Sequence, residues 1–379
     1  MNRLALTASL CMVAAIATAG LAEQVDVDKL AAPLRAVGPQ NQGQAEAAEA
    51  WRELAWAEVE QLPAILAAMD GANPLAINWL RAAADAVAAR AVQAGQPLPL
   101  EQLETFLQNT KHQPEARVTA YEWIARLDDD AESRLIPQKL NDPSMELRHR
   151  AVAMATAKGE AALKAEQKAD AVELFAEAFE ASRDLEQAKK LAKHLEDLGE
   201  KRSLADHFGF VMQWKLVAPF DNVDKKGFDV PYGPESDLAA ATYAGKEGEV
   251  KWIEHTTEDS LGLVDLNEAL ARHKGAICYA LAEFHSQQDR DCEIRIGCIN
   301  ANKVWLNGEL LISNHVYHAG RGMDQYRGVG QLKAGVNRIL VKVAQNEQTE
   351  QWAQDWQFQL RVCDSLGTAI PNSATNNAK

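Results

Sequence analysis

The chain has 379 residues, of which 47% are hydrophobic and 25% are charged, and its 54 acidic residues outnumber its 39 basic ones. A net charge of −15 excludes proteins that bind nucleic acid phosphates or anionic lipid through a basic surface. The length allows two or three domains, each with its own hydrophobic core.

Residues 1–22 have the pattern of a secretory signal peptide. Arg3 precedes a short apolar run, and the segment ends in small residues before Glu23. The run is too short and too rich in alanine for a membrane span, and Leu10 before Cys11 does not match a lipoprotein signal. We therefore expect an exported protein, periplasmic or extracellular, with no membrane span after cleavage and no nucleic acid partner.

A polar linker is predicted over residues 23–46, and an α-helical domain over 47–205. The helical part is rich in Ala, Leu and Glu at a spacing near 3.6 residues, and Pro and Gly break it every 30 to 40 residues. Residues 135–152 resemble a HEAT-type repeat, in which a helix ends at Asp-Pro and the next begins with a buried Arg and an Ala-Val step. Residues 165–198 resemble a tetratricopeptide pair equally well. Such arrays present an exposed surface for protein contact.

A β-sandwich is predicted over residues 206–368, followed by a disordered tail over 369–379. After an opening strand at 214–222, six further segments have the alternating or apolar pattern of strands: 275–284, 291–298, 303–306, 309–312, 336–343 and 356–362. Asn307-Gly308 between two apolar runs predicts a tight hairpin, since both residues tolerate a positive φ. In the last segment Trp356 and Phe358 would face the core, with Gln357 and Arg361 facing outward. The fold class is α+β and multidomain.

The β half resembles the galactose-binding-like jelly roll that follows HEAT-like helices in exported proteins of planctomycete-type bacteria. The resemblance rests on these segments: Pro219-Phe-Asp-Asn222, Gly227-Phe-Asp229, Tyr243-Ala-Gly-Lys246, Val250-Lys-Trp252, Val264-Asp-Leu266, Val304-Trp-Leu-Asn-Gly308 and residues 345–363. It implies a jelly roll with a ligand-binding edge and no established activity. Where related carbohydrate-binding domains carry acidic residues, this chain has Asn300 and Asn302, which could bind a sugar but are poor calcium ligands.

The most ligand-like cluster is the loop 314–326 together with Trp352. It combines aromatic rings that could stack on a sugar with polar side chains that could bind hydroxyl groups. The candidate ligand-binding residues are Tyr317, Arg321, Asp324, Gln325, Tyr326 and Trp352. The alternative is a structural loop that covers the edge of the sandwich.

Four cysteines would remain after signal cleavage. If the strands 276–284 and 291–298 form a hairpin, Cys278 lies near Cys298 and the two could form a disulfide. Free buried thiols are the equal alternative.

No phosphate-binding loop, zinc motif, serine nucleophile elbow or Cys-x-x-Cys pair occurs in the sequence. His315 and His318 lack an evident third ligand, so we expect no metal and no cofactor, with calcium only as a weak option. The leading hypothesis is an exported, non-catalytic binding or scaffold protein that contacts carbohydrate or an envelope protein. The competing hypotheses are a divergent polysaccharide-active enzyme resembling a glycoside hydrolase, and a structural envelope component.

Overall fold

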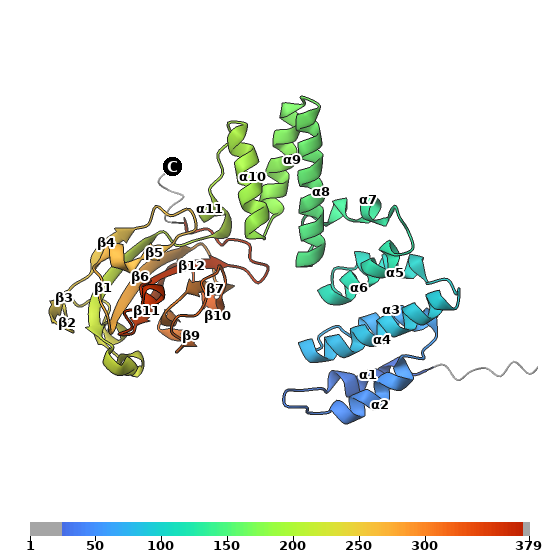
Figure 1. Cartoon of the computed structure of the whole chain (residues 1–379), viewed down its shortest axis with the longest axis horizontal. Helices are drawn as coiled ribbons and strands as arrows, with labels where there is room; N and C mark the ends of the chain where they lie inside the picture. Colours follow the sequence, from blue (N-terminus) through green and yellow to red (C-terminus); the bar gives the residue numbers. More distant parts are fainter. Residues whose placement is uncertain (1–24, 374–379) are drawn as a thin grey trace, which may run out of the picture. The chain divides into compact units, whose positions relative to one another are not determined.

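The computed structural model describes residues 25–373, so the predicted signal peptide lies outside the described residues (Figure 1). Helices occupy the first part of the described chain and antiparallel sheets the last part, which confirms a mixed α+β class. The chain divides into two compact units after Glu132, within the helical part. The change from helix to strand comes later, between Phe208 and Gln213.

The first unit consists of helices that pack in consecutive pairs: α1 on α2, α3 on α4 and α5 on α6 (Figure 1). Asn73 caps the long helix α4 by accepting hydrogen bonds from the amides of Leu75 and Ala76, and Pro74 occupies the first turn. The helices up to residue 139, which include the start of the second unit, are α1 (Val27–Arg35), α2 (Gln44–Leu54), α3 (Leu62–Ala67), α4 (Pro74–Gln93), α5 (Leu100–Gln108), α6 (Pro114–Ala125) and α7 (Ala131–Leu135), with 3₁₀ turns η1 (Val59–Gln61) and η2 (Pro137–Lys139).

The segment predicted as a linker contains the helix α1. Asp26 caps it by accepting a hydrogen bond from the amide of Lys29. Val27, Ala31 and Leu34 are buried at helical spacing. The prediction of a linker over 23–46 is therefore wrong for this stretch, because three apolar residues on one face suffice to pack a short helix against α2.

Four helices of the second unit pack on one another, and the last of them, α11, contacts β12. They are α8 (Met145–Lys164), α9 (Lys168–Ala181), α10 (Leu185–Asp197) and α11 (Leu204–Phe208). Gly159 of α8 allows close approach of α9, because a Cβ atom there would lie 2.5 Å from a ring carbon of Phe175. Ser203 caps α11, and Gly209 ends it with a positive φ.

Two antiparallel sheets form the rest of the unit (Figure 1). The six-stranded sheet has the order β4-β1-β6-β11-β8-β9 and the four-stranded sheet has the order β10-β7-β12-β5, with a small β2-β3 ribbon. The strands are β1 (Gln213–Asp221), β2 (Tyr243–Gly245), β3 (Gly248–Val250), β4 (Ile253–Thr256), β5 (Val264–Asp265), β6 (Ala276–Ser286), β7 (Arg290–Cys298), β8 (Ala301–Leu306), β9 (Glu309–Asn314), β10 (Tyr326–Leu332), β11 (Gly335–Gln345) and β12 (Gln357–Cys363); the short helices are η3 (Val223–Asp229), α12 (Gly233–Ser236), α13 (Leu266–Ala269) and η4 (Gln351–Ala353).

The two sheets enclose a shared hydrophobic core. Alternate residues of β6, among them Cys278 and Phe284, meet Ile294 and Ile296 of β7 and Phe358 of β12 there. As predicted, the turn Asn307-Gly308 joins β8 to β9, and both residues have positive φ values.

The hairpin of strands 276–284 and 291–298, on which the pairing of Cys278 with Cys298 depends, does not form. β6 pairs with β1 and β11, whereas β7 pairs with β10 and β12, so these consecutive strands belong to opposite sheets. The premise for a disulfide between Cys278 and Cys298 therefore fails, and the structure has both as buried free thiols. The Sγ–H groups of Cys278 and Cys298 donate to nearby carbonyl oxygens instead.

Residues 369–373, which were predicted to belong to a disordered tail, pack on the sandwich. Ile370 is buried in the shared core and its amide donates to the carbonyl of Val362. The Oγ of Ser373 donates to the carbonyl of His285. A buried isoleucine close to the C-terminus thus extends the ordered fold, and residues 374–379 lie outside the described residues.

Candidate functional site

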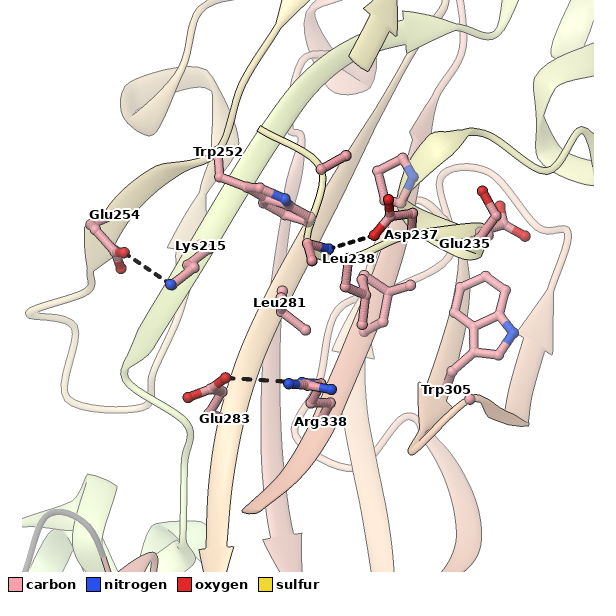
Figure 2. A pocket seen from close by; sticks show the side chains of 16 residues that line it. Lys215, Glu235, Asp237, Leu238, Trp252, Glu254, Leu281, Glu283, Trp305 and Arg338 are labelled. Carbon is pink, nitrogen blue, oxygen red and sulfur yellow. Dashed lines mark hydrogen bonds and ion pairs between the residues drawn. The ribbon is translucent and has the colours of Figure 1, made fainter. Parts of the chain in front are cut away.

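The outer face of the six-stranded sheet, which points away from the shared core, is covered at one end only. There, the chain between β1 and β4 places Phe228 and Tyr243 over Phe220, Ile277 and Tyr279 in a second apolar cluster. A cavity of about 700 Å³ lies on this face (Figure 2), and the leucines at its floor, Leu281 and Leu340, are each 6% exposed. We call this cavity the sheet groove; it is lined by residues 234–240, Lys215, Trp252, Glu254, Leu281, Glu283, Trp305, Gly308, Arg338 and Leu340.

Strand register aligns the floor of the groove. A single row of directly opposed residues runs across five strands: Glu254, Lys215, Leu281, Leu340 and Trp305. Adjacent strands lie about 4.8 Å apart, so the row extends about 19 Å from β4 to β8. The floor is therefore a strip that runs across the strands, with two leucines in its middle.

One tryptophan ends this strip, and a second lies two residues before Glu254, at its other end. Trp305 projects from β8 and Trp252 precedes β4, and both are half-buried. Figure 2 shows them on opposite sides of Leu238 and Leu281. The indole N–H of Trp252 donates to the hydroxyl of Tyr243 at 2.9 Å, which fixes the orientation of its ring. Partly exposed, oriented aromatic rings at the ends of an apolar floor are suited to stacking on flat ligand faces.

One wall of the groove carries a carboxylate that buried side chains hold in place. Oε1 of Glu235 accepts hydrogen bonds from the hydroxyl of Tyr279 and, at 2.9 Å, from Nζ of Lys342. Tyr279 and Lys342 are fully buried and lie opposite one another on β6 and β11. Among the described residues, no donor is bonded to the other oxygen, Oε2, and Glu235 lines the groove.

Burial sets the protonation behaviour of the two donors. It lowers the pKa of Lys342, an effect that the hydrogen bond to Glu235 opposes. Burial, reinforced by the acceptor Glu235, raises the pKa of Tyr279, so its hydroxyl stays protonated and able to donate. Nζ of Lys342 also donates to the carbonyl of Val230 at 2.8 Å, which ties the covering segment to the sheet.

Ion pairs lie along the more exposed side of the groove. Lys215 pairs with Glu254 at 3.4 Å and Arg338 with Glu283 at 4.0 Å (Figure 2). All four side chains are about half-exposed or more, so each pair contributes little to stability and can rearrange around a ligand. Asp237 accepts a hydrogen bond from the amide of Ala239.

The structure does not bring the six residues predicted as ligand-binding together in one site. Tyr317 is half-buried, accepts a hydrogen bond from Asn222 and lies beside His315. Arg321 is exposed and pairs with Asp355 at 3.1 Å. Gln325 accepts a hydrogen bond from the amide of Cys298 and donates to Tyr326, the first residue of β10.

Asp324 has a structural environment. Its carboxylate binds Arg361 through both oxygens and also Arg295, on the outer face of the four-stranded sheet. Trp352, unlike Asp324, is 60% exposed. Its ring lies edge-on to that of His318, with the ring centroids 4.8 Å apart. Trp352 is thus the predicted residue that is most free to meet a ligand.

The side-chain amides proposed as sugar ligands also form hydrogen bonds within the protein. Asn300 is fully buried; it donates to Gln345 and Asp355 and accepts from the amide of Gln357. Asn302 is fully buried as well and donates to the carbonyl of Asn300. This buried amide network joins β8, β11 and the segment before β12, so neither asparagine is accessible to a sugar.

The sequence predictions missed Trp252, Trp305 and Glu235. For Trp305 a signal existed: Val304 and Leu306 point to the core, so the alternation of a strand places the intervening tryptophan on the outer face. Trp252 stands in a segment that carried the family resemblance. Nothing local indicates Glu235, because its role comes from donors on β6 and β11, more than 40 residues away.

Within residues 25–373, no group of three or more His, Cys, Asp or Glu side chains is arranged to hold a metal ion. No helix in the same range is long and apolar enough to cross a membrane.

No family model matches the chain, and no curated protein matches its sequence. Among solved structures, the chain is similar to a β-glucosidase from Kluyveromyces marxianus in complex with glucose, with 18% identity over 27% of this chain and 12% of that one and a TM-score of 0.19. It is similar to an anti-sigma factor domain-containing protein from Clostridium clariflavum, with 10% identity, coverage of 43% and 46% and a TM-score of 0.26. A β-glucuronidase from Ruminococcus gnavus has 12% identity, coverage of 41% and 28% and a TM-score of 0.23. The chain spans less than half the length of each of these three structures.

Proposed function

We propose that the chain is an exported, non-catalytic binding protein whose β-sandwich, a galactose-binding-like jelly roll, binds carbohydrate along the sheet groove. The observation that carries the proposal is the row of opposed residues that ends in Trp305 and has Leu281 and Leu340 as its floor. Sugar rings have one or both faces apolar and an equator of hydroxyl groups. An apolar floor between aromatic rings, bordered by carboxylates and cations, matches this chemistry.

The length of the groove favours an oligosaccharide or polymer over a single sugar. The strip from β4 to β8 extends about 19 Å at the usual strand spacing, well beyond one sugar ring. The ligand would therefore stack on Trp305 and Trp252 through rings that are separated along the glycan chain.

The helical part fits a HEAT-like array that contacts protein. Two helices share a buried arginine near their first turn: Arg117 in α6 and Arg148 in α8. Nε of Arg117 donates to the carbonyl of Leu107, and Nε of Arg148 to that of Asp142. A buried arginine at the start of both helices supports the resemblance of this region to HEAT-type repeats.

The test is a screen of the full chain against a broad panel of neutral and acidic polysaccharides, with and without calcium. We expect binding to a subset of the panel, no dependence on calcium, and no release of shorter sugars. Loss of binding in Trp305→Ala, with an unchanged melting temperature, would support the sheet groove as the site. Release of reducing ends would favour the competing hypothesis of a polysaccharide-active enzyme, and no binding at all would favour a structural envelope component.

A further inference from the structure

The charges that line the sheet groove are unbalanced. Four carboxylates border it, from Glu235, Asp237, Glu254 and Glu283, against the two cations of Lys215 and Arg338. Lys342 adds a positive charge behind Glu235, but its side chain is only 1% exposed and is bonded to Glu235 and to a backbone carbonyl. The surface that a ligand meets is therefore negative, as is the chain as a whole, with a net charge of −15.

Glu235 differs from the other three carboxylates in how it is held. Glu254 and Glu283 are at least half-exposed and pair with mobile cations, and Asp237 is exposed. Glu235 is only 18% exposed, and two fully buried donors fix its Oε1. Because both donors are fully buried on paired strands, packing fixes them, and they hold this carboxylate more rigidly than a surface ion pair would.

We infer that the sheet groove selects an uncharged polysaccharide over an anionic one, and that Glu235 is a specificity-determining residue whose Oε2 accepts hydrogen bonds from ligand hydroxyl groups. This inference rests on the proposed carbohydrate-binding function. A polymer with carboxylate or sulfate groups would meet a groove whose four carboxylates outnumber its two lining cations, on a chain of net charge −15, and this opposes both its approach and its binding. A neutral polymer brings hydroxyl donors, which are the natural partners of a carboxylate oxygen that is already oriented.

Matched pairs of polymers with one backbone and two charge states test the selection directly. Suitable pairs are hydroxyethyl cellulose with carboxymethyl cellulose, and dextran with dextran sulfate. We measure the Kd of the full chain for each polymer at low salt and again at high NaCl. The neutral member of at least one pair should bind, its anionic partner should bind at least about tenfold more weakly, and salt should narrow the difference because it screens charge repulsion.

Two variants separate the role of Glu235 from that of the general charge. Glu235→Gln should weaken binding of the neutral polymer about tenfold or more, because a charge-assisted hydrogen bond is lost. Glu247→Gln is the matched control and should stay within about twofold, since that side chain is exposed and does not line the sheet groove. Glu235→Gln also leaves Lys342 without its charged partner. A second variant, Glu283→Lys, keeps that pair and changes the charge of the groove. It should strengthen binding of the anionic polymer of each pair.

Different results would contradict the charge selection, the role of Glu235 and the carbohydrate-binding function. If an anionic member binds as tightly as its neutral partner and this binding needs Trp305, the selection is overturned while the carbohydrate-binding function stands. If folded Glu235→Gln retains full affinity for the neutral polymer, the role of Glu235 is overturned. If Glu235→Gln does not fold, an unchanged preference in Glu283→Lys overturns the charge selection. Absence of binding to every polymer would overturn the carbohydrate-binding function together with the inference.

Discussion

Asp324 and Arg361 form a two-point ion pair on the outer face of the four-stranded sheet. Nε of Arg361 donates to Oδ1 of Asp324 at 2.6 Å, and Nη2 donates to Oδ2 at 2.5 Å. Arg361 is 2% exposed, and its Nη1 donates to the carbonyl oxygens of Phe208 and Gly367. The pair thereby links the loop before β10 and the end of α11 to the central strand β12.

Asp324→Asn should lower the free energy of unfolding by about 3 kcal/mol, because a buried arginine loses its countercharge. Burial alone would raise the pKa of Asp324, but its hydrogen bonds with Arg361 and Arg295 outweigh this and hold the pKa below its usual value. The contribution of the pair is therefore present above about pH 4 and is lost as the pH falls through the pKa of the folded state.

Chemical denaturation of Asp324→Asn and of Asp355→Asn checks this prediction. Asp355 pairs with the exposed Arg321, so its variant should change stability by less than about 0.5 kcal/mol. Equal stability of the two variants would contradict the structural role of Asp324. Asp324 would then again be a candidate ligand-binding residue.

His207 should make stability depend on pH in the mildly acidic range. It lies between α9 and β12, with its ring 4.3 Å from that of Phe179 and Nε2 3.0 Å from the carbonyl of Ser182. Burial, together with the charges of Arg183 and Arg361, lowers the pKa of His207 to about 4, although the hydrogen bond to Ser182 opposes the shift. The unfolded chain takes up a proton near pH 6.5 and the folded chain only near pH 4, so stability falls by about 3 kcal/mol between these values and then levels off.

Thermal unfolding from pH 7.5 to 3.5 measures this dependence. His207→Gln should remove most of the slope between pH 6.5 and 4, whereas the exposed His149→Gln should keep it. The same slope in His207→Gln as in the parent chain would show that another group titrates there.

The sequence predicted the parts of the fold that local patterns determine. The alternation in 356–362 corresponds to β12, and the Asn307-Gly308 turn joins β8 to β9. The change of pattern near Gln213 marks the start of β1. The strand β10 was missed because Gly328 and Gly330 have low strand propensity. In the structure, a Cβ atom on either glycine would lie 2.8 Å from Leu311 atoms, so close packing against β9 explains both glycines.

The long-range relationships were beyond the sequence. The outer face of β12 was expected to meet solvent, yet Arg361 is buried there because α11 and the loop before β10 cover it. For the same reason the sequence left open whether the loop 314–326 is a binding surface or a structural loop. In the structure, Asp324 binds two arginines and Gln325 binds the backbone of β7. Glu235 gains its role only through donors on β6 and β11.

Gly159→Ala should destabilise the packing of α8 on α9. Alanine favours a helix by up to about 1 kcal/mol over glycine. The added Cβ, however, would lie 2.5 Å from the ring of Phe175, which is fully buried and stacked on His194. Overpacking costs about 1 to 3 kcal/mol, so we expect a net loss of about 1 kcal/mol in denaturation. Gly320→Ala, where a Cβ would meet nothing within 4 Å, should be close to neutral, and a stabilised Gly159→Ala would contradict the close helix contact.

The four cysteines of the β half should be free and unreactive in the folded protein. Burial raises the pKa of Cys298 to about 12 and that of Cys292 and Cys363 to about 11, and it also raises the pKa of Cys278. The test uses a chain that lacks residues 1–22. A thiol reagent at pH 8 should react slowly with this chain while it is folded. After the chain is unfolded without reductant, the reagent should react with four thiols. Two reactive thiols would instead indicate a disulfide, with Cys278–Cys298 as the pair to test first.

A comparison of two tryptophan variants tests the carbohydrate-binding site most directly. Trp305 lines the sheet groove, whereas Trp352 lies near His318 and is not among the residues that line it. We measure the affinity of the full chain, of Trp305→Ala and of Trp352→Ala for the polysaccharide that binds most tightly in the screen. A tryptophan that stacks on a ligand can contribute about 2 kcal/mol or more, so Trp305→Ala should lose about 30-fold in affinity and Trp352→Ala should lose less than about twofold. The reverse result, with binding lost in Trp352→Ala and kept in Trp305→Ala, would contradict the sheet groove and place the site at the loop 314–326.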